Sequence, residues 1–587
     1  MSRPVALLLA SALFAPATLA QVHEVKMLNR TDAGAMVYEP DHLHIAPGDT
    51  VRFLPTMSGH NAASLPGLLP EGAEAFKSKL NQPFEHTFTV PGLYGIQCIP
   101  HLAMGMVMLI QVGDTAAAEL PASLPERQGS PDHSAAPPGG RSMSRWLLAL
   151  PLLGSVPLAL ADSAQSQSRG LIEDSTWSLL NRSVFDQRDY KHGARNSGAR
   201  NAYKPRDQRN GLAEEWAYGL MGTFNSGFTQ GLIGLGVDAH AYLGVQLDSG
   251  GGRAGKARLL GLDNEGHPKN EYSRAGAALK LRMSNTVLSY GEQRVKTPVF
   301  SSSDSRLLPE TATGFFLTST EIDTLKLVAG HFNESTDRNA SSHDQGFVVN
   351  YSDGRQGNSF DLAGMVWNPA AEFSASLYTS RYEDNWNQHY LGSTLSHAFD
   401  DRRSLSLDLN LYRTLDTGKA YSGQIDNTTW SLVSRYAQGP QTFSLGWQQV
   451  DGNTPFDYVT RGAIFLGNAV QMSDFNAPNE RSWQARYDLD MGAFGVPGLN
   501  LSALYVRGFD IDGTHVDPNG GYAYLGYGKG GKHWERDLEA RYVVQSGKAK
   551  GTTVSLRHNL HRGNTAQAEL DGNQIRLAVE WPISGGL

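Results

Sequence analysis

Four residues with metal-binding side chains lie in the first fifth of the chain. Cys98, His101 and Met106 follow the spacing C-x2-H-x4-M, and His60 lies in a separate segment, Ser58-Gly59-His60-Asn61. Two imidazoles, one thiolate and a weakly bound thioether form the ligand set of a mononuclear blue-copper centre. Such a trigonal set changes little between Cu(I) and Cu(II), which favours rapid electron transfer. The spacing therefore predicts a type 1 copper site.

Cys98 is the single cysteine of the 587 residues, so no intrachain disulfide can form. A lone thiol in an exported protein is often reactive or bound to a metal, and the alternative is a buried cysteine that acts as a small hydrophobe. A copper chaperone is a second functional hypothesis, but a chaperone uses open, exchangeable ligands. The closed ligand set favours an electron carrier.

Residues 21–113 show the pattern of a small β-sandwich. Short β-rich runs, such as Thr50–Leu54 and His86–Val90, alternate with the turns Pro47-Gly48-Asp49 and Pro91-Gly92. This pattern predicts two packed sheets that hold the distant His60 near the Cys98 loop.

Residues 25–113 resemble pseudoazurin, a cupredoxin, through Met27-Leu28-Asn29, Met36-Val37-Tyr38-Glu39-Pro40, Glu71-Gly72-Ala73-Glu74 and the ligand loop. The resemblance implies one type 1 copper ion bound by His60, Cys98, His101 and Met106. It also implies that Met104 is not a ligand, that the Asn61 backbone amide donates to the cysteine sulfur, and that Met36 packs beside the exposed histidine ligand.

In that family, electrons pass through the histidine of the C-terminal loop to acidic redox partners such as nitrite reductases. Lys26, Lys77 and Lys79 would steer such a partner by long-range attraction, or would only keep the domain soluble.

The chain contains two segments that resemble export signals. Residues 1–20 have Arg3, an apolar run and Ala20 before a predicted cleavage site. Residues 143–161 repeat the pattern and end in Ala159-Leu160-Ala161, after a linker at 114–142 that is rich in Ala, Pro, Gly and Ser. The internal segment has three explanations: a cleavage site that releases two proteins, a retained membrane tether, or two precursors joined in one sequence.

Residues 162–587 alternate repeatedly between apolar and polar side chains. Examples are 404–411, 482–489 and 574–581, and no apolar run is long enough for a helical span. With 63 glycines and 9% aromatic residues, the pattern predicts an antiparallel transmembrane β-barrel of about 18 strands. The whole chain is therefore expected to be all-β, with a periplasmic copper domain and a barrel embedded in outer-membrane lipid.

The alternation also predicts which face the cations occupy. If apolar residues face lipid, six cations face the lumen: Lys280, Arg282, Arg486, Arg541, Arg557 and Arg576. An arginine facing lipid at the midplane would cost about 2–4 kcal/mol. A lumen lined with guanidinium groups would attract carboxylates. The alternative is that some of these cations lie near strand ends and snorkel to headgroups.

The same region resembles the OprD family of outer-membrane porins over nearly its full length. Matching runs are 224–231, on an early strand, then 305–314, which resembles the inward constriction loop, and 427–432, 455–458, 473–476 and 542–547. The resemblance implies a basic ladder and eyelet of Arg182, Arg188, Arg306, Arg541, Arg557 and Arg576, with Asp474 as the acidic side. Ser555 and Met472 depart from the family pattern, which leaves amino acids and other small carboxylates open as solutes.

Three functions compete for the barrel: a substrate-selective porin, a barrel enzyme and an adhesin. The arginine pattern favours the porin, so no catalytic residues are expected. The net charge of −8 gives no support for nucleic-acid binding.

Overall fold

The structure is a computed structural model of the 587-residue chain. It describes residues 21–31, 34–55, 60–65, 68–70, 72–79, 82–99, 106–113, 163–192, 210–249, 253–263, 267–342, 346–347, 349–353 and 356–586; for 29–31 and 34–36 only the backbone is described. The signal-like segments and the linker lie outside these residues. Two compact units result, Met1–Leu152 and Leu153–Leu587.

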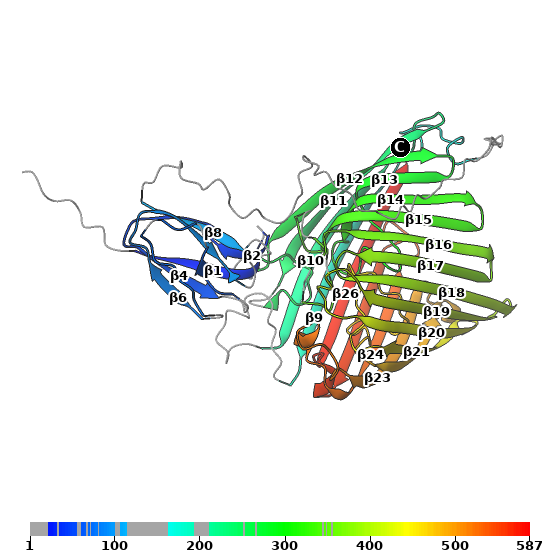
Figure 1. The fold of residues 1–587 in the computed structure, drawn as a ribbon. Coiled ribbons are helices and arrows are strands. Elements are labelled where there is room, and N and C mark those ends of the chain that lie inside the picture. Colours follow the sequence, from blue (N-terminus) through cyan, green and yellow to red (C-terminus); the bar gives the residue numbers. More distant parts are fainter. Residues whose placement is uncertain are drawn as a thin grey trace, which may run out of the picture. The chain divides into compact units, whose positions relative to one another are not determined.

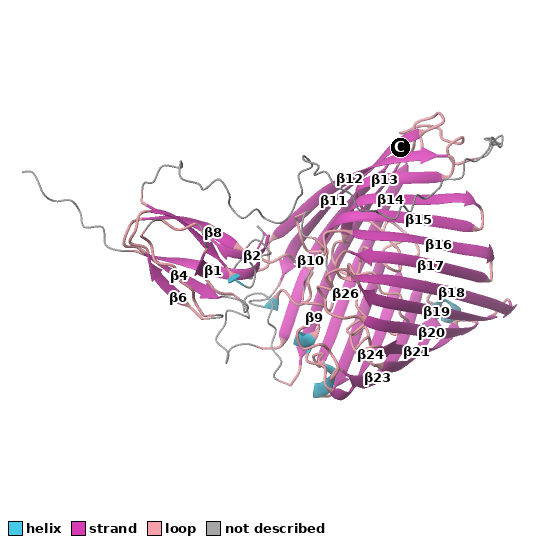
Figure 2. Cartoon of the chain, viewed as in Figure 1, coloured by secondary structure: helices cyan, strands magenta, loops and turns pink. Residues whose placement is uncertain are grey.

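The described residues form strands, turns and short 3₁₀ helices, which confirms the all-β expectation (Figures 1 and 2). The 3₁₀ helices include η6 (Met491–Phe494), η7 (Ala523–Leu525) and η8 (Thr565–Gln567). No described helix is long and apolar enough to cross a membrane.

The first unit consists of two four-stranded sheets. One has the order β2-β1-β4-β6 and the other β3-β8-β7-β5. The strands are β1 (Val22–Thr31), β2 (Gly34–Glu39), β3 (His42–Ile45), β4 (Thr50–Pro55), β5 (Ala63–Ser64), β6 (Phe84–Thr87), β7 (Gly92–Gln97) and β8 (Val107–Val112). The sandwich prediction is confirmed, although the strand expected at His86–Val90 ends at Thr87.

Alternating burial builds the sandwich core. In β4, Val51 and Phe53 are fully buried while their neighbours are partly exposed. Phe53 packs edge-on against Tyr38 with ring centroids 6.2 Å apart. In β7 and β8, Ile96, Met108 and Ile110 join the same core. This core holds the end of β7, which leads into Cys98, against the segment that carries His60.

The second unit is a closed barrel of 18 described strands, as expected (Figure 1). They are β9 (Thr176–Tyr190), β10 (Leu212–Asn225), β11 (Gly234–Asp248), β12 (Glu271–Met283), β13 (Thr286–Gln293), β14 (Thr311–Ile322), β15 (Leu325–Thr336), β16 (Phe360–Ala370), β17 (Phe373–Tyr382), β18 (Trp386–Asp400), β19 (Arg403–Asp416), β20 (Asp426–Gln438), β21 (Gln441–Asp451), β22 (Arg481–Asp490), β23 (Leu499–Asp512), β24 (Lys529–Val543), β25 (Thr553–Gly563) and β26 (Gly572–Gly586).

Each barrel strand pairs antiparallel with its neighbours in sequence, and β26 pairs with β9 to close the ring. Closure removes the free edges that an open sheet would expose, so every backbone N–H and C=O of the wall can be paired within the membrane.

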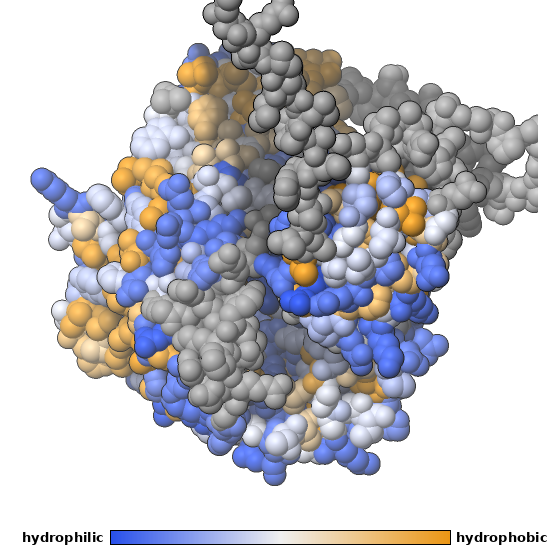
Figure 3. All heavy atoms as spheres, turned by 90° about the vertical axis from the view of Figure 1, so that its left-hand side faces the viewer, coloured by the Kyte–Doolittle hydropathy of each residue, from blue (hydrophilic) through white to orange (hydrophobic). Residues whose placement is uncertain are grey.

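The two faces of the wall differ as the alternation predicts. In β12, Leu279 is 68% and Leu281 44% exposed, while Lys280 between them is partly buried. Many other large apolar side chains are also exposed on the strands, among them Leu395, Leu445 and Trp581. The face drawn in Figure 3 shows apolar patches next to polar ones. The apolar face suits lipid, and the opposite face meets the inward loops described below.

Residues directly after the internal signal-like segment already belong to the barrel unit. The Ala164 N–H donates to Asn285 Oδ1 at 2.7 Å, and the Gln165 N–H donates to Ser284 O at 3.1 Å. Gln165 Nε2 also donates to Thr229 O at 2.9 Å. The run 224–231 was expected on an early strand, but only its first two residues lie on one, because β10 ends at Asn225. The remaining residues form a turn that contacts the segment around Gln165. Within this turn, Phe228 O accepts a hydrogen bond from Ser168 Oγ.

Candidate copper pocket and pore constriction

Three of the four predicted copper ligands lie in the described residues and are completely buried. His60, Cys98 and Met106 each have 0% exposure. His60 Nδ1 lies 3.7 Å from Cys98 Sγ, so the imidazole and thiol face one another. The fourth predicted ligand, His101, lies outside the described residues, as does Met104.

Backbone bonds bring the two ends of the ligand loop together. The Cys98 N–H donates to Met106 O at 3.0 Å, which holds these two predicted ligands side by side. Asn61 Oδ1 accepts from the Ile99 N–H at 2.9 Å, which ties the His60 segment to that loop. Tyr38 Oη donates to Asn61 O at 2.8 Å and holds Asn61 from the other side. The contacts described for Asn61 thus involve its side chain and carbonyl, so the bond from its backbone amide to the cysteine sulfur stays a prediction. The Met36 side chain lies outside the described residues.

The pocket fits a copper ion. A metal ion bonded to sulfur at about 2.3 Å and to imidazole nitrogen at about 2.0 Å can bridge atoms up to about 4.3 Å apart, which exceeds the 3.7 Å between His60 Nδ1 and Cys98 Sγ. A buried set of imidazole, thiol and thioether is the soft donor set that copper prefers.

In the barrel, three predicted arginines gather around one buried carboxylate. Asp186 of β9 is fully buried, and the charges of Arg188, Arg306 and Arg576 all act on it. Arg188 Nε donates to Asp186 Oδ1 at 3.1 Å. Arg338, which the sequence analysis missed, also lies near Arg306. The group also has other charged neighbours: Glu215 acts on Asp186, Asp337 and Glu310 act on Arg338, and Arg258 lies near Arg188 and Arg338. Counting these neighbours, the guanidinium groups still outnumber the carboxylates.

Strand register continues this basic region along the wall. Arg557 of β25 is the register partner of Arg576 in β26, and Arg576 is the partner of Asp186 in β9. Arg557 Nη1 donates to Gln471 Oε1 at 3.0 Å, and its Nε lies 3.0 Å from Glu539. A hollow of about 240 Å³ is lined by Arg557 together with Gln471, Arg486, Ser502, Asp537, Glu539 and Asn559.

Arg182, predicted for the basic ladder and eyelet, binds two carboxylates and the backbone of a loop. Its Nη1 donates to Asp304 Oδ1 at 2.7 Å and its Nε to Glu580 Oε1 at 2.6 Å. The same Nη1 also donates to the backbone carbonyls of Arg306 and Leu307. Arg182 thus ties the connection between β13 and β14, residues 294–310, to the wall, and this connection is called the constriction loop below. Of the run 305–314 predicted as that loop, residues 311–314 belong to β14.

The other predicted cations are distributed around the wall. Lys280 pairs with Asp238 at 2.5 Å, and Arg282 donates to Gln165 and lies 4.0 Å from the Phe228 ring centroid. Arg486 donates to both oxygens of Asp488. Arg541 is exposed near the end of β24, with no ion pair to any described residue. These four cations lie outside the group around Asp186.

Asp474, the predicted acidic residue, lies in the loop between β21 and β22. Its Oδ2 accepts hydrogen bonds from Tyr351 Oη at 2.7 Å and Tyr458 Oη at 2.8 Å. Two loops distant in sequence are therefore joined at this carboxylate.

Buried carboxylates of the wall hold the inward loops by their backbones. Glu215 of β10 is completely buried and accepts from the N–H groups of Gly255, Ala257, Leu259 and Leu260 at 2.7–3.2 Å. Glu535 of β24 accepts in the same way from two consecutive N–H groups, those of Met472 and Ser473.

A loop carboxylate, Asp457, repeats this arrangement. It accepts from the N–H groups of Asn350, Tyr351 and Ser352. Burial raises the pKa of Asp457 to about 6, although the hydrogen bonds from backbone N–H groups favour its charged form.

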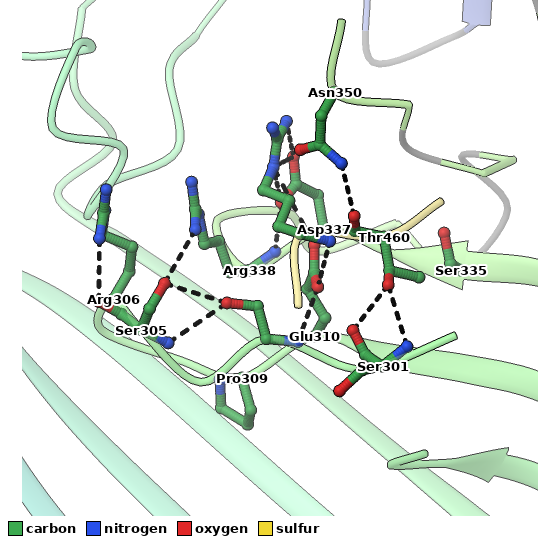
Figure 4. A network of polar contacts seen from close by, with 12 residues as sticks. Ser301, Ser305, Arg306, Pro309, Glu310, Ser335, Asp337, Arg338, Asn350 and Thr460 are labelled. Carbon is green, nitrogen blue, oxygen red and sulfur yellow. Dashed lines mark hydrogen bonds and ion pairs between the residues drawn. The ribbon is translucent and has the colours of Figure 1, made fainter. Parts of the chain in front are cut away.

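Figure 4 shows how the constriction loop joins two further loops. Arg461 Nη2 donates to Asp337 Oδ2 at 2.9 Å, and the Arg461 N–H donates to Glu310 Oε2 at 3.0 Å. Thr460 Oγ1 donates to Ser301 O at 2.6 Å. Burial alone would raise the pKa of Asp337, but Arg461 and Arg338 outweigh it and lower the value. Hydrogen bonds and ion pairs therefore join these three loops into one charged cluster.

Comparison with known proteins decides the family of the barrel. The family profile described as outer membrane porin, OprD family, matches residues 169–585. Porin D of Pseudomonas aeruginosa is 44% identical over 444 residues, covering 73% of this chain and 96% of porin D. The chain belongs to the OprD family.

Solved porins agree with this assignment. A crystal structure of P. aeruginosa OprD has a TM-score of 0.61 at 41% identity and covers 72% of this chain and 98% of that one. OpdK of P. aeruginosa, solved with vanillate, has a TM-score of 0.62 at 32% identity and covers 71% of this chain and all of OpdK. The barrel is thus an outer-membrane porin, which favours the porin over the enzyme and adhesin hypotheses.

The first unit matches a different family. The profile of copper binding proteins of the plastocyanin/azurin family covers residues 25–113. Pseudoazurin of Paracoccus pantotrophus is 52% identical over 103 residues, which cover 18% of this chain and 70% of that pseudoazurin. The chain therefore joins a periplasmic pseudoazurin domain to an OprD-family porin.

The Glu215 clamp gives a test of how the loops are held. We expect Glu215→Gln to weaken the loop around 255–260 by about 1–3 kcal/mol, because a neutral amide accepts these N–H bonds less strongly and places an NH₂ among donors. Hydrogen exchange of the amides of Gly255, Leu259 and Leu260 should accelerate. Glu372→Gln, an exposed glutamate in the turn between β16 and β17, serves as the control. Unchanged exchange in Glu215→Gln would show that the clamp does not hold the loop.

Proposed function

We propose that the barrel conducts small carboxylate-bearing solutes, including amino acids, across the outer membrane. The observation that carries this proposal is the group of Arg188, Arg306, Arg338 and Arg576 near Asp186. Excess guanidinium charge lowers the energy of an anion in the narrow part of the pore. The adjoining hollow of about 240 Å³ offers room for a small solute beside Arg486 and Arg557.

The solute's carboxylate would pass between weak sites rather than bind at one. Arg557 and Arg576 lie opposite one another on neighbouring strands, so a carboxylate can exchange one guanidinium for the next. Asp474 and its two tyrosine hydroxyls would offer an acceptor to a cationic group of the same solute. The vanillate in solved OpdK is itself a carboxylate, which supports this solute class.

Removing one guanidinium should weaken uptake. We expect Arg576→Gln to reduce vanillate flux into proteoliposomes by roughly tenfold, because a hydrogen bond to a charged group contributes about 1.5–3 kcal/mol. The reversal potential in planar bilayers should shift toward cations. Arg402→Gln, in the exposed turn before β19, removes the same charge away from the proposed path. Equal flux through Arg576→Gln and Arg402→Gln would contradict the proposal.

We further propose that the first unit carries one electron through a type 1 copper ion bound by His60, Cys98, His101 and Met106. The complete burial of three ligands supports a carrier over a chaperone, since exchange of the metal requires access. Bound copper supplies the one-electron redox change, while the protein residues fix the geometry and exclude water. The exposed lysines Lys26, Lys77 and Lys79 would steer an acidic partner, such as a nitrite reductase.

The copper assignment has a spectroscopic test. Loading with Cu(II) should produce an intense blue thiolate-to-copper band, and Cys98→Ser should abolish it because a hydroxyl cannot replace the thiolate. Met106→Leu should keep the band but shift its position and the redox potential. Met108→Leu, a buried methionine two residues further on, should change neither. A loaded domain without the blue band would refute the ligand set.

We also propose that residues 1–20 and 143–161 both act as export signals and that cleavage after Ala161 frees the barrel from the copper domain. The docking of Ala164 and Gln165 onto the barrel supports a mature barrel that begins near residue 162.

Antibodies to each unit should therefore detect two mature products. The copper domain should appear in the periplasm and the barrel in the outer membrane. One full-length band in the outer membrane would show instead that 143–161 is retained as a tether.

A further inference from the structure

Two histidines and two glutamates form a buried cluster at the wall of the barrel, outside the basic region around Asp186. His533 of β24 and His561 of β25 are 4% and 1% exposed. Glu569 lies in the connection between β25 and β26, and Glu480 directly precedes β22. His533 Nδ1 is 2.8 Å from His561 Nε2 and 3.4 Å from Glu569 Oε2, and His561 Nε2 is 3.2 Å from that same oxygen.

The outer partners of the two imidazoles determine where their protons lie. His533 Nε2 is 2.6 Å from Glu480 Oε1, and His561 Nδ1 is 3.1 Å from Leu570 O. Both partners are acceptors, so each imidazole must donate outward. In the neutral rings, the lone pairs of His533 Nδ1 and His561 Nε2 then point at each other beside a carboxylate oxygen. Three electron pairs converging on one point repel each other unless a proton or a metal ion lies between them.

The ligand spacing suits a tetrahedral zinc ion. Two ligands about 2.0–2.1 Å from zinc at a tetrahedral angle are roughly 3.3 Å apart. The two distances to Glu569 Oε2, 3.4 and 3.2 Å, agree with this value. The imidazole pair at 2.8 Å would have to open by about half an ångström. The outward bonds to Glu480 and Leu570 match the carboxylate and carbonyl partners that orient metal-bound histidines.

The surroundings hold these side chains in place. The Phe475 ring stacks on His533 with centroids 4.2 Å apart. Gly508, the register partner of His533, leaves room for the cluster, because a Cβ at that position would lie 1.9 Å from Glu480 Oε1. Glu569 Oε2 is shielded from solvent and accepts no hydrogen bond of acceptable geometry from the described residues.

We propose that His533, His561 and Glu569 bind a divalent zinc ion, with Glu480 as the positioning residue behind His533. The ion would fasten the β25–β26 connection to the wall. Through Phe475 it would also stiffen the loop that carries Asp474. Three protein ligands leave a fourth position for water.

Zinc titration of the outer-membrane product that contains the barrel tests the site. If that product is full-length, the copper site is first removed by His60→Ala and Cys98→Ser, so that only the barrel can bind the metal. One equivalent of Zn²⁺ should then bind by calorimetry, and Co²⁺ should give the visible d–d bands of a four-coordinate ion without a sulfur charge-transfer band. His533→Gln or His561→Gln should abolish this binding.

Two further variants keep the test decisive. Glu480→Gln should retain one equivalent but lower the affinity about 10–100-fold. His558→Gln, on β25 but outside the cluster, should bind zinc as before. Heat-modifiable gel migration identifies any variant that fails to fold. If a histidine variant fails to fold, Glu569→Gln, in the connection between β25 and β26, is used in its place. Absence of zinc binding, with only proton uptake by the histidines, or equal binding in His561→Gln and His558→Gln, would overturn the proposal.

Discussion

The inward loops depend on carboxylates that accept hydrogen bonds from consecutive backbone N–H groups. A loop inside a barrel has no sheet to satisfy its amides, and unpaired buried amides are costly. Glu215 and Glu535 supply acceptors from the wall, and Asp457 supplies them from a neighbouring loop. Because each carboxylate binds two or more amides, it fixes the local course of the loop as well as its distance from the wall. These three side chains thus hold the segments 255–260, 472–473 and 350–352 in place.

This arrangement also explains how the pore can hold so many cations. Arg182 and Arg461 are neutralised by Asp304, Glu580 and Asp337, and they serve as structural ties between loops and wall. The cations around Asp186 exceed their carboxylate partners, so the net positive potential is concentrated there. Arginines that tie loops to the wall and arginines of the group near Asp186 therefore differ in their partners and not in residue type. The copper pocket follows a related principle. Hydrogen bonds of the Asn61 side chain and of the Cys98 backbone N–H fix the segments that carry the predicted ligands.

The sequence was sufficient for the parts that follow from periodicity and spacing. Alternation together with the length of the segment predicted a barrel of about 18 strands, and the C-x2-H-x4-M spacing placed Cys98 and Met106 in one pocket with His60. Contacts between distant loops could not be obtained in this way. Glu215, Asp337 and Arg461 lie in segments without a motif, and only tertiary structure brings them together. Period-two analysis applied to acidic residues would have placed Glu535 on the inner face with the arginines, but not the loop that it holds.

The pairing of β26 with β9 has a consequence for assembly. Asp186 lies on the first strand of the barrel and Arg576 on the last, and the two become neighbours only when the ring closes. Before that step, β9 and β26 are free edges, and the centre of the cation group is divided between the two ends of the sheet. The contact between these two strand ends therefore forms in the same step that seals the wall. Closure of the barrel and assembly of the cation group thus depend on a single strand pairing.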